Sequence, residues 1–468
     1  MSTIKLKSSV EHLSADTLTP VGLYLRLRDS FPQSLLLECT DFSSRQDAFS
    51  YICLNPVAGI EVTGKEIREY FPGKQTLSRN WLNGEDVISA TDSFSNKIII
   101  ENMPEEKIFP GIFGFTSYEA VNLFDNVNIE KHNSSSPLPL LRYDLYSVVI
   151  AINHFNSTMS VCELGSNPET IHTRRITSLL ANKNITTFPF RTYGEEFSNL
   201  EDDKFLDMVL QGKKHCARGD VFQIVLSRRF EQNFQGDEFS VYRALRSVNP
   251  SPYLFYFDYL GYKLFGSSPE AQLQINDGQA TINPIAGTIP KTGDKISDEG
   301  LAKALLTDPK ENSEHSMLVD LARNDLSRHS GNVRVSTYKE VHAYSHVIHL
   351  VSTVTGDLKD DNKAYRVFAD TFPAGTLSGA PKHRAIQLID QIEPTGRGYY
   401  GGAIGYMGLR GSLNHAIMIR SFFSYGGKLY YQAGAGIVIE SVPEKELEEV
   451  KSKLSALRQA LKMAETIK

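Results

Sequence analysis

Two tight turns between short apolar runs constrain the fold of this chain most strongly. Residues 273–275 and 280–282 flank Asn276-Asp277-Gly278, and Gly426-Gly427 separates residues 417–423 from 429–432. Asp-Gly and Gly-Gly accept the positive φ that a two-residue hairpin loop requires, so each turn predicts an antiparallel hairpin. Helical patterns are interspersed among such runs without strict strand–helix alternation. We therefore predict an α+β fold, in which large antiparallel β-sheets pack in layers with helices on the outside.

Further apolar runs indicate that the first half of the chain is rich in β-strands. These runs lie at residues 35–38, 49–54, 98–100 and 147–152. The stretch from about 165 to 203 is polar, and an amphipathic helix follows it over residues 203–218, where Gly219-Asp220 ends the pattern. The sequence therefore predicts two parts, residues 1–200 and residues 201–468.

The composition is that of a globular protein and excludes several functional classes. Among 468 residues, 49 Lys and Arg against 55 Asp and Glu give a net charge of −6, which disfavours binding to nucleic-acid phosphates. The sequence contains neither an apolar run long enough to span a membrane nor a signal-peptide pattern, so we expect a cytoplasmic protein. The four cysteines form no C-x-x-C pair, and no dinucleotide fingerprint or Walker A loop occurs. Zinc, disulfide and nucleotide-cofactor sites are therefore disfavoured.

Two pairs of glutamates suggest a metal site. Glu311 and Glu314 are three residues apart in a helical pattern, and Glu446 and Glu449 have the same spacing, so the members of each pair share one helix face. Either pair alone is more typical of a solvated face. Four carboxylates together would suit Mg²⁺, which prefers oxygen ligands and can bridge to an anionic substrate.

Other residues suit the binding of an organic anion. Glycine-rich stretches, which let a backbone approach a ligand but are more often turns, occur at 287–288, 375–376, 401–402 and 434–436. Arg420 follows an apolar run over 416–419 and needs either a structural salt bridge or a substrate carboxylate. His349 lies among apolar residues, where it is either a core histidine or a catalytic group.

The order and wording of eight strings resemble the chorismate-utilising enzymes. Two of them are Asn283-Pro-Ile-Ala-Gly-Thr288 and Phe372-Pro-Ala-Gly-Thr-Leu-Ser-Gly-Ala-Pro-Lys382, and the others lie at 219–229, 266–270, 308–315, 319–326, 398–402 and 432–436. This resemblance covers about residues 200–460 and implies the chorismate-binding fold of that family.

Within that family, two positions make the chain most similar to the anthranilate synthase component I branch, which converts chorismate and ammonia to anthranilate and pyruvate in tryptophan biosynthesis. Gln223 stands where relatives that add water to chorismate have a lysine base, and Ala286 stands where aminodeoxychorismate synthases usually have a lysine. The resemblance implies an Mg²⁺-dependent lyase that receives ammonia from a separate glutamine amidotransferase subunit in a hetero-oligomer. The alternatives are aminodeoxychorismate synthase component I and a catalytically silent protein that binds tryptophan or chorismate.

The roles known in the family carry over to the matching residues of this sequence. Glu314 and Glu449 would be the principal Mg²⁺ ligands, with Glu311 and Glu446 in support, and the ion would hold the ring carboxylate of chorismate. Glu270 would be the general acid that protonates the departing C4 hydroxyl. Thr288, Thr376 and His349 would line the ring as catalytic residues. The remaining residues expected to bind chorismate are Gly287, Tyr400, Arg420, Gly434, Ala435, Gly436 and Lys453.

The resemblance also implies feedback inhibition by L-tryptophan bound to the N-terminal part. Leu36-Leu-Glu-Cys39 and Asn249-Pro-Ser-Pro-Tyr253 resemble the two elements of the family's tryptophan site. The expected contacts are Glu38, Cys39, Pro250, Ser251 and Tyr253. Cys39 stands where serine is usual, and a thiol is a weaker hydrogen-bonding group than a hydroxyl. We therefore expect weaker inhibition, unless Cys39 is simply a buried strand residue.

Overall fold

The computed structural model describes residues 3–39, 48–103, 111–127, 129, 137–165, 171–181, 185–292, 294–343, 347–359 and 364–467. Its strands are β1 (Ile4–Ser14), β2 (Leu35–Cys39), β3 (Phe49–Thr63), β4 (Glu66–Tyr70), β5 (Leu77–Asn80), β6 (Ile98–Glu101), β7 (Gly111–Thr116), β8 (Leu141–Asn153), β9 (Thr158–Gly165), β10 (Phe190–Ser198), β11 (Gln223–Gly236), β12 (Tyr253–Asp258), β13 (Lys263–Ser268), β14 (Ala271–Asn276), β15 (Gln279–Ile282), β16 (Ile285–Pro290), β17 (Ser330–Ala343), β18 (Val347–Leu358), β19 (Gly379–Ala380), β20 (Ala403–Gly408), β21 (Leu413–Ile417), β22 (Ser421–Tyr425) and β23 (Lys428–Ile437).

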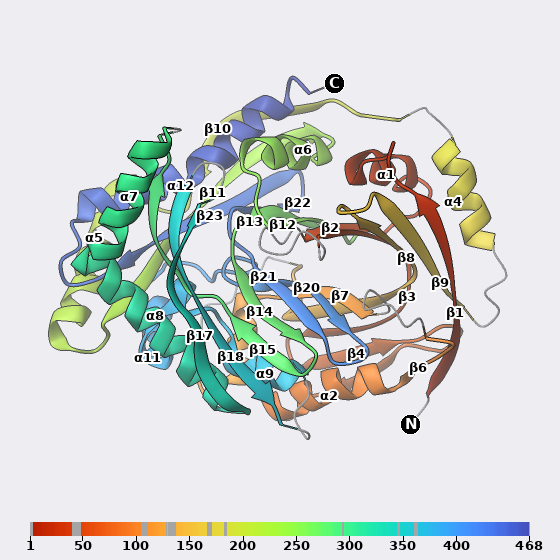
Figure 1. Cartoon of the computed structure of the whole chain (residues 1–468), viewed down its shortest axis with the longest axis horizontal. Helices are drawn as coiled ribbons and strands as arrows, with labels where there is room; N and C mark the ends of the chain where they lie inside the picture. The colour runs from red at the N-terminus through yellow and green to blue at the C-terminus, as the bar shows by residue number, and fades with distance from the viewer. Residues whose placement is uncertain are drawn as a thin grey trace.

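The helices lie around the outside of these strands, as Figure 1 shows. They are α1 (Pro20–Leu27), α2 (Gly84–Asn96), α3 (Val121–Phe124), α4 (Ile171–Ala181), α5 (Asp202–Arg218), α6 (Phe239–Val248), α7 (Lys295–Thr307), α8 (Pro309–Ser327), α9 (Ala364–Thr371), α10 (Gly375–Ser378), α11 (Lys382–Ile392) and α12 (Pro443–Ala464). Nearly all strand pairings are antiparallel, and the pairing of β1 with β6 is parallel. The predicted α+β class with layered antiparallel sheets is confirmed. Among the described residues, no helix is both long and apolar enough to cross a membrane.

Both predicted hairpins are present, and their turn residues adopt the expected conformations. Asn276 pairs with Gln279 across the β14–β15 turn, where Asp277 and Gly278 have φ of 48° and 75°. Tyr425 pairs with Lys428 across the β22–β23 turn, where both glycines have positive φ. Two-residue loops with positive φ are favoured because their backbone twist matches the right-handed twist of the strands that they join. Similarly, α5 ends at Gly219, whose φ is 79°.

The expectation of one continuous strand over 417–423 is wrong. β21 ends at Ile417, which pairs with Ala403 of β20, and β22 begins at Ser421, which pairs with Gly266 of β13. The chain therefore changes its strand partners between these two positions. Arg420 makes this change in a left-handed conformation, with φ of 47°, which is strained for a residue with a Cβ.

Strands from the two predicted parts of the chain pair with one another. β2 lies beside β12, and β7 lies beside β20. β10, in the stretch expected to be a polar connection, pairs with β11. The two largest groups of buried apolar side chains each draw on the beginning and the end of the sequence, for example Leu36 with Leu454 and Ile112 with Ile404. The boundary near residue 200 stays a prediction.

The long β11–β23 pairing positions the predicted glycine-rich stretch. Val225 lies opposite Gly436, and Ser227 lies opposite Gly434. Helix α12 packs on β23 and thus brings its own polar residues to the same region. At another edge, β16 pairs with β18 so that the backbone of Thr288 lies opposite His349. The candidate site is therefore built from several short strands and turns that are distant in the sequence.

Candidate functional site

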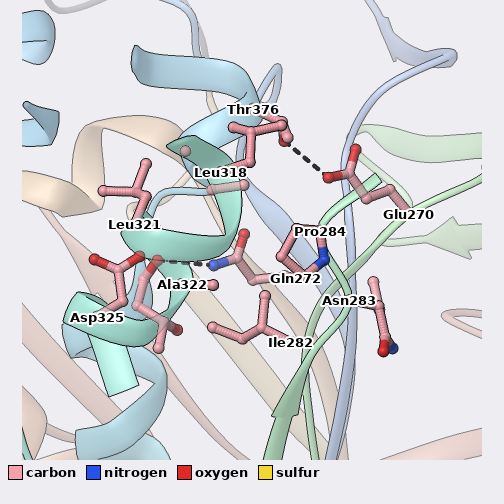
Figure 2. A pocket seen from close by; sticks show the side chains of 14 residues that line it. Glu270, Gln272, Ile282, Asn283, Pro284, Leu318, Leu321, Ala322, Asp325 and Thr376 are labelled. Atoms are coloured by element: carbon pink, nitrogen blue, oxygen red, sulfur yellow. Dashed lines mark hydrogen bonds between the residues drawn. The ribbon is translucent and has the colours of Figure 1, made fainter. Parts of the chain in front are cut away.

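Glu270 lies in the short connection between β13 and β14, and its side chain is half-buried. Thr376, near the start of α10, donates a hydrogen bond from Oγ1 to Glu270 Oε1 at 2.9 Å (Figure 2). Burial raises the pKa of Glu270 to about 7, while the Thr376 hydrogen bond and the charges of Lys453 and Arg420 act in the opposite direction. Such a carboxyl group can hold a proton near neutral pH and release it to a leaving group.

Two cations lie within electrostatic reach of this carboxyl group. Burial lowers the pKa of Arg420, whose Nη1 donates to Asn249 Oδ1 at 3.4 Å. Lys453 of α12 donates from Nζ to the carbonyl of Gly434 at 2.9 Å and forms an ion pair with Glu449 at 2.7 Å. A neutral acid beside two cations suits a substrate that carries carboxylates and a leaving hydroxyl group.

Neighbouring groups of the protein approach the backbone of Gly434 and Gly436 closely, because neither residue has a side chain. A Cβ at Gly434 would lie 2.8 Å from the carbonyl oxygen of Leu226 and 3.1 Å from the Tyr400 hydroxyl oxygen. A Cβ at Gly436 would lie 2.4 Å from Nε2 of Gln223. Ala435, between the two glycines, is buried in the core. The structure thus brings Tyr400 and Gln223 close to the glycine-rich stretch.

His349 contacts the second glycine-rich stretch. Its Nδ1 lies 3.1 Å from the carbonyl oxygen of Gly287. Because a carbonyl can only accept, Nδ1 carries the proton and Nε2 is the acceptor nitrogen of the neutral ring. Burial lowers the pKa of His349, which favours that neutral form. The side chains of Thr288 and Ala286 lie outside the described part of the structure, so the roles expected of them stay predictions.

The four glutamates lie on two helices, and their donor chemistry fits Mg²⁺. Asp308 caps α8 by accepting from the Glu311 backbone N–H at 3.0 Å, so both Glu311 and Glu314 are helical. A Cβ at Gly287 would lie 2.6 Å from Leu305 Cδ1 and 3.1 Å from Glu311 Oε2, so Glu311 packs closely against the Gly287 backbone. Glu446 is buried in α12, while Glu449 is exposed and paired with Lys453.

Across the residues with described positions, no three His, Cys, Asp or Glu side chains are grouped closely enough to hold a metal ion. Magnesium binding therefore stays a prediction, supported by the oxygen donors that the four carboxylates offer. The ammonium group of Lys453 now balances the charge of Glu449, and a bound cation would compete with it.

Comparison with known proteins places these residues in a family. The sequence matches the pattern of the chorismate binding enzyme family over residues 37–459. The chain belongs to the chorismate binding enzyme family. The anthranilate synthase component 1 of Aquifex aeolicus is 35% identical over 97% of this chain and 94% of its own, and that of Thermus thermophilus is 36% identical over 96% and 97%. The crystal structure of anthranilate synthase component I from Streptococcus pneumoniae superposes with a TM-score of 0.75 at 29% identity, covering 96% of this chain and 99% of that one.

Membership of the chorismate binding enzyme family confirms the resemblance inferred from the eight strings. The fold likewise agrees with that of the solved relative. The roles of the individual site residues, including those that lie close together in the structure, stay predictions.

The two strings expected to bind tryptophan lie side by side. Cys39 of β2 pairs with Tyr253 of β12, although the strings are far apart in sequence. Glu38 is buried and accepts hydrogen bonds from Tyr242 at 2.6 Å and from Arg246 at 2.9 and 3.1 Å. Burial raises the pKa of Cys39 to about 12, so its thiol is not ionised at neutral pH.

The second string is linked to the predicted chorismate site. Asn249 donates from Nδ2 to Ser251 Oγ at 3.3 Å, while its Oδ1 accepts from Arg420. The hydroxyl oxygen of Tyr253 accepts a hydrogen bond from Gln274 Nε2 at 2.8 Å. Pro250, which follows Asn249, is exposed. One asparagine therefore contacts residues assigned to both candidate sites.

A small cavity behind Glu270 contains residues to which the sequence assigned no role. It has a volume of about 30 Å³ and lies between α8 and β14 (Figure 2). Asp325 lines it and accepts from Lys382 Nζ at 2.7 Å, and burial raises the pKa of Asp325 to about 6. Gln272 donates to the carbonyl of Thr371 at 3.1 Å. Asp325 and Lys382 both occur in strings that carry the family resemblance. Their place in these strings is the feature of the sequence that could have indicated a role for them.

Proposed function

We propose that this chain is the large component of an anthranilate synthase. It would convert chorismate and ammonia to anthranilate, pyruvate and water. The observation that carries this proposal is the carboxyl group of Glu270, hydrogen-bonded by Thr376, with a pKa of about 7 and with the charges of Arg420 and Lys453 acting on it. The relatives named anthranilate synthase component 1, which match nearly the whole chain, support the same activity.

Substrate binding would use the cations and the backbone that meet at this site. The guanidinium of Arg420, together with the Gly434–Gly436 backbone and the Tyr400 hydroxyl, would hold the enolpyruvyl carboxylate of chorismate. Lys453 adds a positive charge from α12. An Mg²⁺ ion bound by the glutamates of α8 and α12 would supply charge neutralisation for the ring carboxylate.

Glu270 would then act as the general acid. Ammonia attacks C2 of the ring as the C4 hydroxyl departs, and Glu270 gives its proton to that oxygen so that water leaves. Loss of the C2 proton and of pyruvate makes the ring aromatic. Neutral His349, with its Nδ1 proton held by the Gly287 carbonyl, can take part through Nε2. Gln223 is not a base, which suits ammonia because it is already nucleophilic.

The ammonia would come from glutamine on a separate amidotransferase subunit. Hydrolysis of glutamine by such subunits needs an activated nucleophile, and the cysteines of this chain are poor candidates. Cys39, Cys53 and Cys162 are buried, and Cys216 is half-buried. Burial raises the pKa of Cys39, Cys53 and Cys216, whereas a reactive cysteine needs a lowered pKa.

Feedback inhibition by tryptophan belongs to the same proposal. The pairing of Cys39 with Tyr253 brings the two expected elements together. The contact between Asn249 and Arg420 offers a route from that site to chorismate binding. An allosteric effect requires that tryptophan and chorismate favour different states of such a contact.

A direct assay tests the proposal. The purified chain is incubated with chorismate, Mg²⁺ and ammonium at alkaline pH, and both anthranilate fluorescence and pyruvate release are followed. We expect both products in equal amounts and none from Glu270→Ala. An aminated product without pyruvate would instead indicate aminodeoxychorismate synthase, and the absence of any product despite chorismate binding would indicate a silent binding protein. A tryptophan titration in the same assay tests inhibition.

A further inference from the structure

A buried ion pair outside the predicted site residues joins the segments that carry them. Arg397 is 2% exposed and Glu393 is 3% exposed. Arg397 donates from Nε to Glu393 Oε2 at 2.9 Å and from Nη2 to Oε1 at 2.6 Å. This two-pronged geometry fixes the guanidinium plane as well as its position.

The ion pair also holds strand β11 at two points. Arg397 Nη2 donates to the carbonyl of Val225 at 2.8 Å, and Glu393 Oε1 accepts from the N–H and Oγ of Ser227 at 2.8 and 2.7 Å. In the antiparallel register, Val225 is opposite Gly436 and Ser227 is opposite Gly434. The two contacts therefore fix the strand against which the glycine backbone of the predicted carboxylate site is aligned.

Arg397 reaches two more candidate site segments. Its Nη1 donates to the carbonyl of Leu377 at 2.6 Å, the residue after Thr376. Its guanidinium carbon lies 4.7 Å from the ring centre of Tyr118 and 5.7 Å from that of Tyr400. The positive charge of Arg397 also acts on the Tyr400 hydroxyl, because it counteracts the rise in pKa that burial causes there.

We propose that Arg397 and Glu393 form a positioning pair for chorismate: they set Tyr400, Thr376 and the β11–β23 backbone in the geometry that binds the substrate. A buried ion pair is weak evidence for stability, since desolvation offsets much of its attraction. Its four directed contacts instead define relative positions. The expected change in kcat/KM rests on the proposed function. The expected change in affinity requires only that the chain binds chorismate.

The experiment compares Arg397→Lys with the matched control Arg142→Lys. Arg142 also pairs with a buried carboxylate, donating from Nε to Asp144 at 2.9 Å, and also lies over a tyrosine ring, that of Tyr259 at 4.4 Å. It belongs to β8, which carries none of the predicted site residues. Lysine keeps the charge in both variants but cannot reproduce the directed hydrogen bonds of the guanidinium group. Chorismate binding with Mg²⁺ and without ammonium is measured by calorimetry, followed by kinetics and thermal unfolding.

We expect Arg397→Lys to lower kcat/KM for chorismate about 100-fold, the scale of a misplacement of about 1 Å in a catalytic site. Chorismate binding should weaken with it, the KM for ammonium should stay unchanged, and Arg142→Lys should bind chorismate like the unmodified protein. Unaltered binding by folded Arg397→Lys, or an equal loss in Arg142→Lys, would overturn the inference.

If Arg397→Lys does not fold, Glu393→Gln decides the question. This variant keeps an acceptor for Ser227 but loses the charge that orients Arg397, so weaker chorismate binding is expected and unaltered binding would refute the pairing role. The proposed function fails separately, when the unmodified chain binds chorismate but forms no anthranilate. In that case the comparison of chorismate affinity between Arg397→Lys and Arg142→Lys still tests the role of the positioning pair.

Discussion

Replacing Glu270 with glutamine should stabilise the protein above neutral pH while abolishing anthranilate formation. Burial raises the pKa of this carboxyl group from 4.5 to about 7. Between these two values the folded state holds the proton more tightly than the unfolded state, so the free energy of unfolding falls as pH rises. At about 1.36 kcal/mol per pKa unit, ionised Glu270 destabilises the fold by about 3 kcal/mol at pH 8 and by about 1 kcal/mol or less at pH 5.

The test measures unfolding of Glu270→Gln and the unmodified chain at pH 5 and pH 8. Glutamine can still accept the hydrogen bond from Thr376, so packing changes little. A gain of about 3 kcal/mol corresponds to a rise of about 3 °C in the unfolding temperature of a chain of this length.

Glu196→Gln serves as a control of opposite sign. Although burial opposes its ionisation, hydrogen bonds from Arg458 and Tyr431 lower the pKa of Glu196, so this variant should lose stability at pH 8. A gain in Glu270→Gln that is equal at both pH values, or a loss at pH 8, would refute the reasoning.

Three further outcomes are expected. Gly434→Ala should reduce kcat/KM for chorismate by about 10-fold or more, because the new methyl group would meet Leu226 and Tyr400, whereas Gly261→Ala, which opens onto free space, should match the unmodified enzyme in the same assay. Arg420→Met should weaken chorismate binding by about 2–4 kcal/mol in calorimetry, since it removes the half-buried cation proposed to pair with a substrate carboxylate; equal affinity would exclude this role. Cys39→Ser should lower the tryptophan concentration needed for half-inhibition several-fold, because a hydroxyl hydrogen-bonds better than a thiol, and an unchanged titration curve would leave Cys39 as a strand residue only.

Local features of the structure could be predicted because single residues encode them. The turns at Asp277-Gly278 and Gly426-Gly427 need positive φ, and glycine supplies it at little steric cost. The end of α5 at Gly219 follows from the same property. The spacing of Glu311 and Glu314 likewise fixes their shared helix face, whatever surrounds the helix.

Other features depend on packing between distant segments and could not be derived from local patterns. Arg420 interrupts what the sequence presents as a continuous apolar run, because the chain exchanges one strand partner for another at that residue. The pairing of Asp325 with Lys382 and the contacts of Arg397 with Leu377 and Val225 are equally long-range. No periodicity marks such residues before the fold is known.

By itself, the sequence determined the antiparallel hairpins, the helix faces and, through its eight strings, the family to which the chain belongs. The tertiary structure decided that Glu270 lies within the field of two cations, that Cys39 pairs with Tyr253, and that one buried ion pair joins several distant segments. The reason is physical: backbone conformation and amphipathic spacing are set by neighbouring residues, whereas burial, charge proximity and pKa are set by whichever distant segments the fold brings together.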